Sequence, residues 1–133
     1  MPLDVHVVTP ERELWRGQAD FVAARPEGGE IGVLPGHAPF LGVLKHSHVK
    51  VQDNGGEHFF AVHGGFIQVF EDKVTILGTA AELAEEIDIE AARAARERCE
   101  EALRNGHTDE AWEQLQRAEA RLRTAGEAGL IAG

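Results

Sequence analysis

The 133-residue sequence has a single cysteine, few basic residues and no long hydrophobic run, and each shortage excludes a class of protein. Cys99 cannot form an internal disulfide, which fits a reducing compartment. With 13 Lys and Arg against 23 Asp and Glu, the net charge of −10 argues against a generic nucleic-acid binder, because phosphate contacts need clustered positive charge. No run approaches the roughly 20 apolar residues of a membrane span, and Asp4 and His6 interrupt the start. We therefore expect neither direct membrane insertion nor a secretory signal.

Signatures of catalysis are also scarce. No Gly-rich loop is followed by Lys and Ser or Thr, so the apparatus of nucleotide hydrolysis is missing, and Ser47 lies in no nucleophile-elbow motif. The seven histidines include no pair at helical ligand spacing, and only His46 and His48 lie two apart on a predicted strand. We interpret them as solvated strand histidines, with a histidine-based metal-dependent enzyme as an alternative. The sequence thus predicts no catalytic residue, no metal site and no cofactor.

The composition changes near residue 80. All five prolines and all six phenylalanines precede Gly78, whereas 14 of the 19 alanines lie from Ala80 onward. The first part has the turn-rich, β-branched and aromatic content of short strands, and the second has that of alanine-rich helices. We predict a mainly β plus α fold, in which an N-terminal β-sandwich domain over residues 1–84 is followed by an antiparallel two-helix hairpin over residues 85–133.

Nine short strands are expected in the first part, and their close spacing favours an all-β sandwich. Asn54 and Gly55 predict a tight hairpin turn with positive φ angles, and Glu71 and Asp72 mark a second reversal. Segments 59–62 and 66–70 carry apolar groups on both faces and should be covered on both sides. The nine candidates are residues 3–8, 14–16, 21–25, 31–34, 40–44, 49–51, 57–62, 66–70 and 73–77.

Two helices are predicted after residue 87. Asp88 can cap the first, which should end at Asn105 and Gly106, and Thr108 or Asp109 can cap the second. We expect the second helix to end at Gly126. Each helix has a thin apolar stripe, and an alanine-rich seam buries little area, so the hairpin should depend on the surface where it docks. The stripes are Ala92, Ala95, Cys99 and Leu103 in the first helix, and Ala111, Leu115, Ala118 and Leu122 in the second.

A glycine- and proline-rich loop over residues 28–39 is the most specific local run. Its backbone is sharply contoured, and it holds Glu30 and His37 as polar groups. The run can be a well-specified turn between two strands, or a rigid docking face.

Four segments together resemble the epsilon subunit of the bacterial F-type ATP synthase. They are residues 29–39, residues 61–67, the strand over residues 73–77, and Ile87 with Asp88 ahead of a helix rich in Ala, Arg and Glu. The similarity covers essentially the whole chain in order. It implies a noncatalytic subunit of the rotating central stalk, which couples rotation of the membrane ring to ATP synthesis in a proton-translocating enzyme.

The resemblance also implies partners and contact residues. In that family the sandwich binds the gamma subunit and rests on the rotor ring of the membrane sector, at the cytoplasmic face of the cell membrane. The helical hairpin either folds onto the sandwich or extends toward the alpha and beta subunits, where it inhibits ATP hydrolysis. By position, Glu30 and His37 would lie near the rotor ring, and Arg117, Arg121 and Arg123 would meet the catalytic subunits.

One departure concerns ATP as a regulatory ligand. Some family members bind ATP through Ile or Leu, Asp, two variable residues, Arg and Ala, together with later arginines. Here Asp88 and the later Arg98 match, but Ala91 occupies the place of the motif's arginine. We therefore interpret Asp88 first as a helix cap, and the departure argues against ATP sensing. A free-standing β-sandwich binding module with a helical dimerisation tail is the alternative function.

Overall fold

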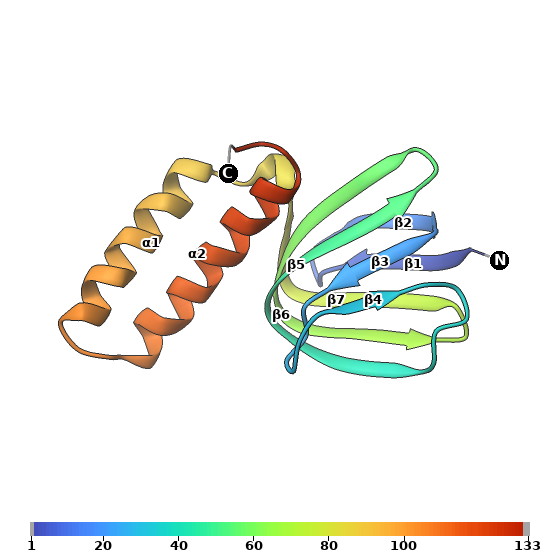
Figure 1. Cartoon of the computed structure of the whole chain (residues 1–133), viewed down its shortest axis with the longest axis horizontal. Coiled ribbons are helices and arrows are strands. Elements are labelled where there is room, and N and C mark those ends of the chain that lie inside the picture. Colours follow the sequence, from blue (N-terminus) through green and yellow to red (C-terminus); the bar gives the residue numbers. More distant parts are fainter. Residues whose placement is uncertain (1, 132–133) are drawn as a thin grey trace.

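Seven strands, a short 3₁₀ helix and two α-helices make up the computed structural model, which describes residues 2–131 (Figure 1). The predicted β-sandwich followed by a two-helix hairpin is confirmed. Residues 1, 132 and 133, which belong to the two predicted domains, lie outside the described residues. The strands are β1 (Leu3–Val8), β2 (Glu13–Ala19), β3 (Phe21–Ala24), β4 (Ile31–Val33), β5 (Phe40–Asp53), β6 (Gly56–Phe70) and β7 (Lys73–Leu83). The helices are η1 (Ala84–Glu86), α1 (Ile89–Arg104) and α2 (Asp109–Glu127).

The strands form one continuous sheet in the order β2-β1-β7-β6-β5-β3-β4, which folds back on itself as a sandwich. The β1 and β7 strands are parallel, and the other neighbours are antiparallel. The prediction of nine strands was wrong, because four of the predicted segments join in pairs to form the long strands β5 and β6. Gly64 and Gly65 (φ 71° and 135°) lie inside β6, and a Cβ on Gly65 would meet the Leu77 carbonyl at 1.8 Å. The sequence analysis predicted two separate strands on either side of these glycines. In the structure they lie within one bent strand, whose pairing continues on both sides.

Two of the reversals were predicted at the right places. Glu71 and Asp72 have φ angles of 48° and 62° and form the tight turn between β6 and β7, as expected. The conformation predicted for the turn at residues 54 and 55 was wrong, since the positive φ angle (137°) belongs to Gly56. There the Asp53 carboxylate accepts a hydrogen bond from the Gly55 N–H at 2.7 Å, so a side chain replaces the expected backbone geometry.

The hydrophobic core lies inside the sandwich. Its sixteen buried members all fall between Leu3 and Ile76 and are at most 2% exposed. They include large side chains such as Phe60, Leu44 and Ile67. Since burial of apolar area stabilises by about 25 cal/mol per Å², the sandwich has a stabilising interior that is complete without the hairpin.

Two strand segments were expected to be covered on both sides. Phe60, Ala61 and Val62 are buried and Phe59 is half-buried, which agrees with that expectation for residues 59–62. The expectation was wrong for residues 66–70, where buried and exposed side chains alternate along the strand. The first segment lies against α2, where Thr124 Oγ1 is 3.4 Å from the Phe60 carbonyl, and Figure 1 shows α2 packed beside β5 and β6.

The helix starts follow the sequence closely. The Asp88 carboxylate accepts a hydrogen bond from the Ala91 N–H at 3.0 Å and caps α1. At the next start Thr108, rather than Asp109, is the cap, and its Oγ1 accepts from the Ala111 N–H at 3.1 Å. Both predicted stripes are buried or half-buried along the seam between α1 and α2.

The helix ends agree less well. The first helix ends at Asn105 and Gly106 as predicted, with Gly106 at φ 143°. The second continues past Gly126 to Glu127, so that prediction was wrong. Gly129 (φ 79°) supplies the left-handed residue instead, and the Leu130 N–H donates to the Ala125 carbonyl at 2.9 Å. The sequence pattern shows that a helix ends near a glycine, but it does not show which of two nearby glycines ends it.

Candidate functional site

The surface between α2 and the sheet is the candidate functional site, because it joins the two parts of the chain. Three histidines of β5 and β6 lie there with side chains only 9% (His46), 8% (His48) and 3% (His63) exposed. The interpretation of these three as solvated strand histidines was therefore wrong. The strand pattern shows which side chains share a face, but it does not show that a helix more than forty residues later in the chain covers that face.

His46 and His63 form a buried pair. Their Nδ1 atoms are 2.8 Å apart, so one ring donates the hydrogen bond and the other accepts it, which requires the accepting ring to be neutral. Burial lowers the pKa of both imidazoles; the neighbouring His63 ring lowers that of His46 further, and Arg117 adds to the effect on both. Nε2 of His63 is buried and has no hydrogen-bond partner among the described residues. The pair is thus a polar contact that depends on a single shared proton.

An ion pair from α2 to β7 lies beside the histidine pair. Arg121 donates from Nε to Glu82 Oε1 at 2.6 Å and from Nη2 to Glu82 Oε2 at 3.2 Å, and both side chains are about one-fifth exposed. Burial opposes the ionisation of Glu82, but the nearby His63 ring and the Arg121 pair outweigh it and hold the pKa of this carboxyl below its ordinary value. This two-pronged contact fixes the orientation of α2 on the sheet.

A second polar cluster lies near the end of α2. Arg123 donates to Glu30 at 2.8 Å and to Glu127 at 3.2 Å. The His48 Nε2 atom is 3.4 Å from Glu30 Oε1 and 3.8 Å from Glu127 Oε1, and burial lowers the pKa of this histidine. The buried Thr124 Oγ1 hydroxyl donates to the Ala120 carbonyl of its own helix at 2.8 Å and lies 3.4 Å from the Phe60 carbonyl of β6. Hydrogen bonds and charge pairs therefore occupy much of the contact between the hairpin and the sandwich.

The two residues predicted to lie near a rotor ring are at opposite ends of β4. Glu30 immediately precedes that strand and is held by Arg123 of the hairpin. His37 follows it in a turn where its N–H donates to the Leu34 carbonyl at 3.1 Å. The Gly36 N–H also donates to Asp72 Oδ1 at 2.7 Å, which fastens this loop to the turn between β6 and β7. The structure therefore does not bring Glu30 and His37 together.

The three arginines predicted as regulatory contacts face the sandwich in this conformation. Arg121 and Arg123 are paired with Glu82 and Glu30, and Arg117 lines a groove beside the histidine pair. The sequence analysis named both Glu30 and Arg123 but gave no signal that they pair, since they are 93 positions apart. In the docked hairpin, two of the three guanidinium groups are already bound to carboxylates.

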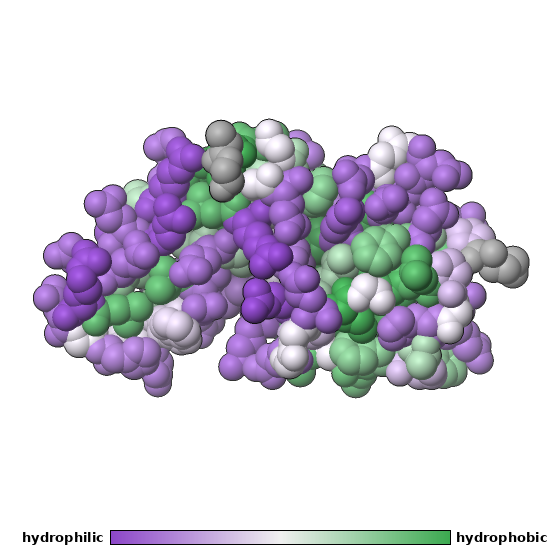
Figure 2. Space-filling model, viewed as in Figure 1, coloured by the Kyte–Doolittle hydropathy of each residue, from purple (hydrophilic) through white to green (hydrophobic). Residues whose placement is uncertain are grey.

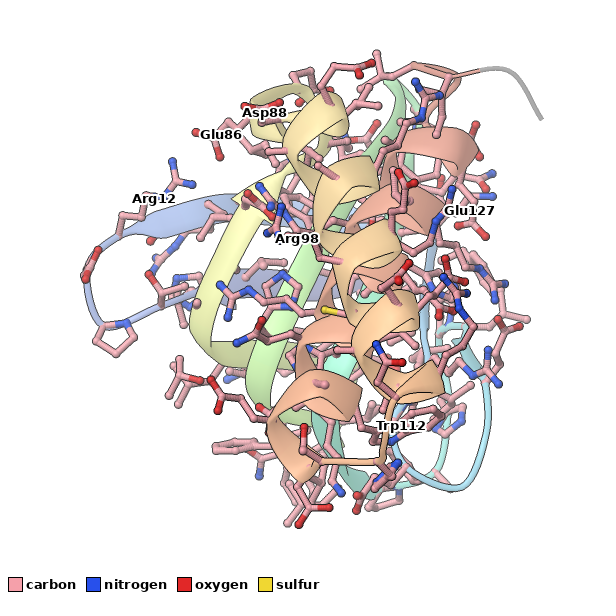
Figure 3. All side chains as sticks on the ribbon, turned by 90° about the vertical axis from the view of Figure 1, so that its left-hand side faces the viewer. Arg12, Glu86, Asp88, Arg98, Trp112 and Glu127 are labelled. Atoms are coloured by element: carbon pink, nitrogen blue, oxygen red, sulfur yellow. The ribbon has the colours of Figure 1, made fainter. Side chains whose placement is uncertain are left out.

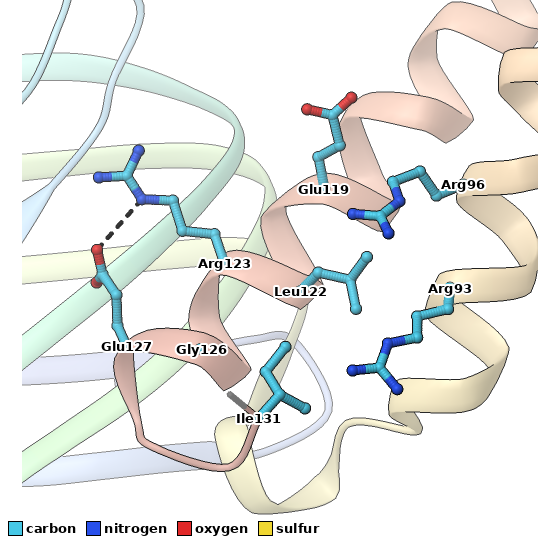
Figure 4. A pocket seen from close by; sticks show the side chains of 8 residues that line it. All are labelled: Arg93, Arg96, Glu119, Leu122, Arg123, Gly126, Glu127 and Ile131. Atoms are coloured by element: carbon cyan, nitrogen blue, oxygen red, sulfur yellow. Dashed lines mark hydrogen bonds and ion pairs between the residues drawn. The ribbon is translucent and has the colours of Figure 1, made fainter. Parts of the chain in front are cut away.

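Asp88 and Arg98, the residues matching a nucleotide motif, lie on different turns of the α1 region (Figure 3). Ten positions correspond to about 15 Å along a helix axis, so the two side chains do not share one local site. A separate groove of about 560 Å³ runs between α1 and α2, where Arg93 and Arg96 project toward α2 (Figure 4). Neither Asp88 nor Arg98 lines this groove. Its lining residues are Arg93, Arg96, Glu119, Leu122, Arg123, Gly126, Glu127 and Ile131.

An exposed apolar strip crosses the part of the sheet that the hairpin leaves open. It consists of Leu41 (68% exposed) and Val43 (52%) on β5, with Phe66 (36%) and Phe70 (52%) on β6. Val43 pairs directly with Phe66, and alternate residues share a face, so the four side chains lie on one surface. Figure 2 shows apolar side chains gathered on the sandwich, whereas the hairpin is largely hydrophilic. Contiguous exposed apolar side chains of this kind are typical of a partner interface.

The apolar strip continues toward the hairpin. Val43 also lines a groove of about 820 Å³ between the sheet and the first half of α2. Trp112, which is 49% exposed, and Arg117 line the helix side of this groove, and His46 and His63 line the sheet side. The strip and the histidine pair therefore border one continuous groove, which Lys45 and Glu113 also line.

Two features are absent from residues 2–131. In that part of the chain, three or more His, Cys, Asp or Glu side chains nowhere converge as a metal-binding group. None of its helices combines the length and the apolar content needed to cross a membrane.

Two family models match consecutive parts of the chain. Residues 2–84 match the model described as ATP synthase, Delta/Epsilon chain, beta-sandwich domain. Residues 85–126 match the model described as ATP synthase, Delta/Epsilon chain, long alpha-helix domain. Together the two models account for nearly all the residues that the structure describes.

Individual proteins give the same picture. The chain is 50% identical to the ATP synthase epsilon chain of Thermobifida fusca over 92% of this chain and 91% of the relative. It is 46% identical to that of Solibacter usitatus, over 92% and 95%. Its fold is similar to a chain in the structure of the Euglena gracilis mitochondrial ATP synthase, with a TM-score of 0.75, 24% identity, and coverage of 98% of this chain and 82% of that one.

Proposed function

The chain belongs to the family of ATP synthase epsilon chains, and from that membership we propose that it is a noncatalytic rotor subunit of the central stalk with a regulatory hairpin. On this proposal the sandwich holds the subunit in place at the cytoplasmic face of the membrane, as a peripheral component. The hairpin controls ATP hydrolysis by leaving the sandwich. Family membership favours this function over a free-standing binding module with a dimerisation tail.

The contrast between the two parts of the chain carries the proposal. The sandwich core closes between Leu3 and Ile76 without any contribution from the hairpin. The hairpin is held mainly by α2, through a mixture of alanine packing, histidines and ion pairs such as Arg121 with Glu82. An element docked in this way can exchange one surface for another of similar affinity, and a modest difference in contacts then shifts its population.

The apolar strip supports a place for the gamma subunit. Leu41, Val43, Phe66 and Phe70 lie together on an open face and stay exposed while the hairpin is docked. An aliphatic and aromatic surface of this kind binds a partner by burying apolar area. The strip is also fixed to the rigid sheet, so it can hold gamma whether the hairpin is docked or extended.

The loop that follows β4 supports a place for the rotor ring. Leu34 is 59% exposed in the loop that also carries His37, and the Asp72 contact holds this loop rigid. We assign the ring contact to this loop. Glu30, which was predicted to share that contact, is engaged by Arg123 while the hairpin is docked.

The hairpin supplies the regulatory contacts. In the docked state Arg121 and Arg123 are bound to Glu82 and Glu30, and extension of the hairpin would free them together with Arg117. A free guanidinium group can bind a carboxylate through two parallel hydrogen bonds. Acidic segments of the alpha and beta subunits are therefore suitable targets. We propose no cofactor for this function, and no role for ATP as a regulatory ligand of this chain.

Binding to gamma is tested by a charge placed in the apolar strip. Leu41→Glu should weaken copurification with the gamma subunit about tenfold or more, because it puts a carboxylate into an apolar contact. Gln52→Glu, an exposed position near the other end of the same strand, is the matched control and should bind normally. Equal binding by both variants would rule out the strip as the gamma contact.

Regulation is tested by removing the hairpin. A chain ending at Glu86 should remain folded, assemble into the complex and raise its rate of ATP hydrolysis, since the inhibitory element is gone. The same complex containing the full chain is the control. Unchanged hydrolysis in a complex shown to contain the truncated chain would refute the inhibitory role and leave the rotor role standing.

A further inference from the structure

We propose that the buried His46–His63 pair makes hairpin docking pH-sensitive, so that mild acidification releases α2 from the sandwich. The pair joins β5 to β6 directly beneath α2, at the edge of the groove lined by Trp112 and Arg117. The release is a property of the isolated chain and needs no partner. Only its consequence, a larger share of the extended and inhibitory form at low pH, depends on the function proposed above.

The geometry of the pair permits a single proton between the two rings. With the Nδ1 atoms 2.8 Å apart, one nitrogen carries the hydrogen and the other must offer its lone pair. A proton on the accepting Nδ1 places two N–H groups face to face and abolishes the hydrogen bond, and once both rings are imidazolium like charges are in contact. The repulsion is relieved when the rings separate, and α2 is the helix that lies beside them.

The carboxylates beside the pair favour such a charge, but they do not outweigh the burial of the two rings. On α2, Glu113 lies 3.6 Å from His46 Nε2, but its side chain is 76% exposed and screened by water. On β7, Glu82 lies 3.7 Å from His63 Nε2, but Arg121 already holds both of its oxygens. Arg117 and Arg121 of α2 add positive charge on the same side.

The direction of the effect follows from linkage. In the docked state the pKa of both histidines is lowered, and in the released state the rings meet water and regain ordinary values near 6.5. The released state therefore binds more protons as the pH falls below about 6.5, so docking is strongest above that pH and weakens below it. Each proton taken up on release lowers the docking constant about tenfold per pH unit inside this window.

Release is expected to be local. The sandwich core between Leu3 and Ile76 does not include the histidine pair or any part of the hairpin. A third covered histidine, His48, faces Glu30 and Glu127, with Arg123 and Arg25 nearby, and burial lowers its pKa as well. Acidification thus acts on the docking surface at several points while the core residues carry no titratable group.

The test follows docking in the full chain by energy transfer between two dyes. In a Cys99→Ala background, labels on Asn54→Cys and Glu97→Cys report the separation of sandwich and hairpin, since both positions are exposed. The expected result is a loss of the docked signal between pH 7 and pH 5. His46→Asn with His63→Asn keeps a hydrogen-bonding group at each Nδ1 place without titrating, and it should reduce the pH dependence to less than half.

His6→Asn is the matched control, because His6 lies on β1, bonded to Glu13, and does not face the hairpin. Its docked signal should change with pH as in the unmodified chain. The proposal is overturned if the unmodified chain stays docked at pH 5, or if the double variant keeps the full pH dependence.

A second measurement does not require the variants to fold. The ring-proton NMR signals of the full chain give the pKa of His46 and His63 directly, and values at or above the ordinary 6.5 would overturn the proposal. ATP hydrolysis by the assembled complex is measured separately, and a failure there counts against the regulatory function and not against the switch.

Discussion

The sandwich and the hairpin are stabilised in different ways. The sandwich buries large side chains such as Phe60, Leu44 and Ile67 in a core that is at most 2% exposed. The hairpin buries mainly alanines, with Leu115, Leu122 and Cys99, and it meets the sandwich through charged and polar groups. Apolar burial scales with area, whereas exposed ion pairs add little. One chain therefore contains a rigid body and an element whose attachment can be adjusted.

The largest expected effect comes from the core of the sandwich. Phe60→Ala should lower the free energy of unfolding by about 3–5 kcal/mol, because it removes a fully buried ring and leaves a cavity. Urea unfolding followed by circular dichroism measures this loss. Since α2 rests on this strand, hairpin and sandwich should unfold together in the variant. A loss under about 1 kcal/mol would contradict the view that the sandwich is stabilised by its core.

A smaller and more local effect is expected from the helical seam. Leu122→Ala should cost about 2 kcal/mol, the low end for a buried leucine, since the seam can partly close around a neighbouring alanine. Hydrogen exchange should show loss of protection confined to α1 and α2. If the strands lost protection to the same extent, the two parts would be one cooperative unit and the proposed hairpin movement would have no structural basis.

The docking ion pairs sharpen the comparison further. Arg121→Gln should weaken docking by about 1.5 kcal/mol, because Glu82 is left half-buried without its partner. Arg123→Gln is the control on the same helix, where the arginine and Glu30 are both about half exposed, and it should cost less than about 1 kcal/mol. The dye-labelled chain described above measures both. The reverse order would mean that the end of α2, and not its middle, holds the hairpin.

Much of the fold could be predicted because its signals are local. Asp88, Thr108 and Gly106 mark helix ends through contacts within a few residues, and Glu71 with Asp72 makes a turn by its own backbone preference. The long bent strands were missed because Gly64 and Gly65 have the same local signature as a loop.

The candidate site was harder to predict, since it depends on contacts between distant parts of the chain. Glu30 and Arg123 were singled out separately, and their pairing appears only when the hairpin is docked. His46 and His63 come from different strands, and neither their mutual contact nor their burial follows from the local sequence. A strand pattern gives a side chain its face, but the neighbour across that face is set by tertiary packing.

The smallest expected effect concerns the boundary between the two regions. Arg12 of the β1–β2 turn donates from Nη1 to Glu86 Oε2 at 2.9 Å, and Glu86 Oε1 accepts from the Leu83 N–H at 2.9 Å (Figure 3). The Arg12 hydrogen bond, aided by that N–H, lowers the pKa of Glu86 to about 2. Both charged side chains are more than one-third exposed, so Glu86→Gln should cost less than about 1 kcal/mol at neutral pH.

The pH dependence of that cost identifies the ion pair as its source. A lowered carboxyl pKa gives stability that is present above the ordinary value of 4.5 and is lost as the pH falls toward about 2. Thermal unfolding of the full chain and of Glu86→Gln should therefore differ at pH 7 and converge as the pH approaches 2. Glu85→Gln, at the exposed neighbouring position, should follow the full chain throughout. A difference that stays constant with pH would assign the effect to the Leu83 cap, and the linker would then be fixed by its own backbone and not by the sandwich.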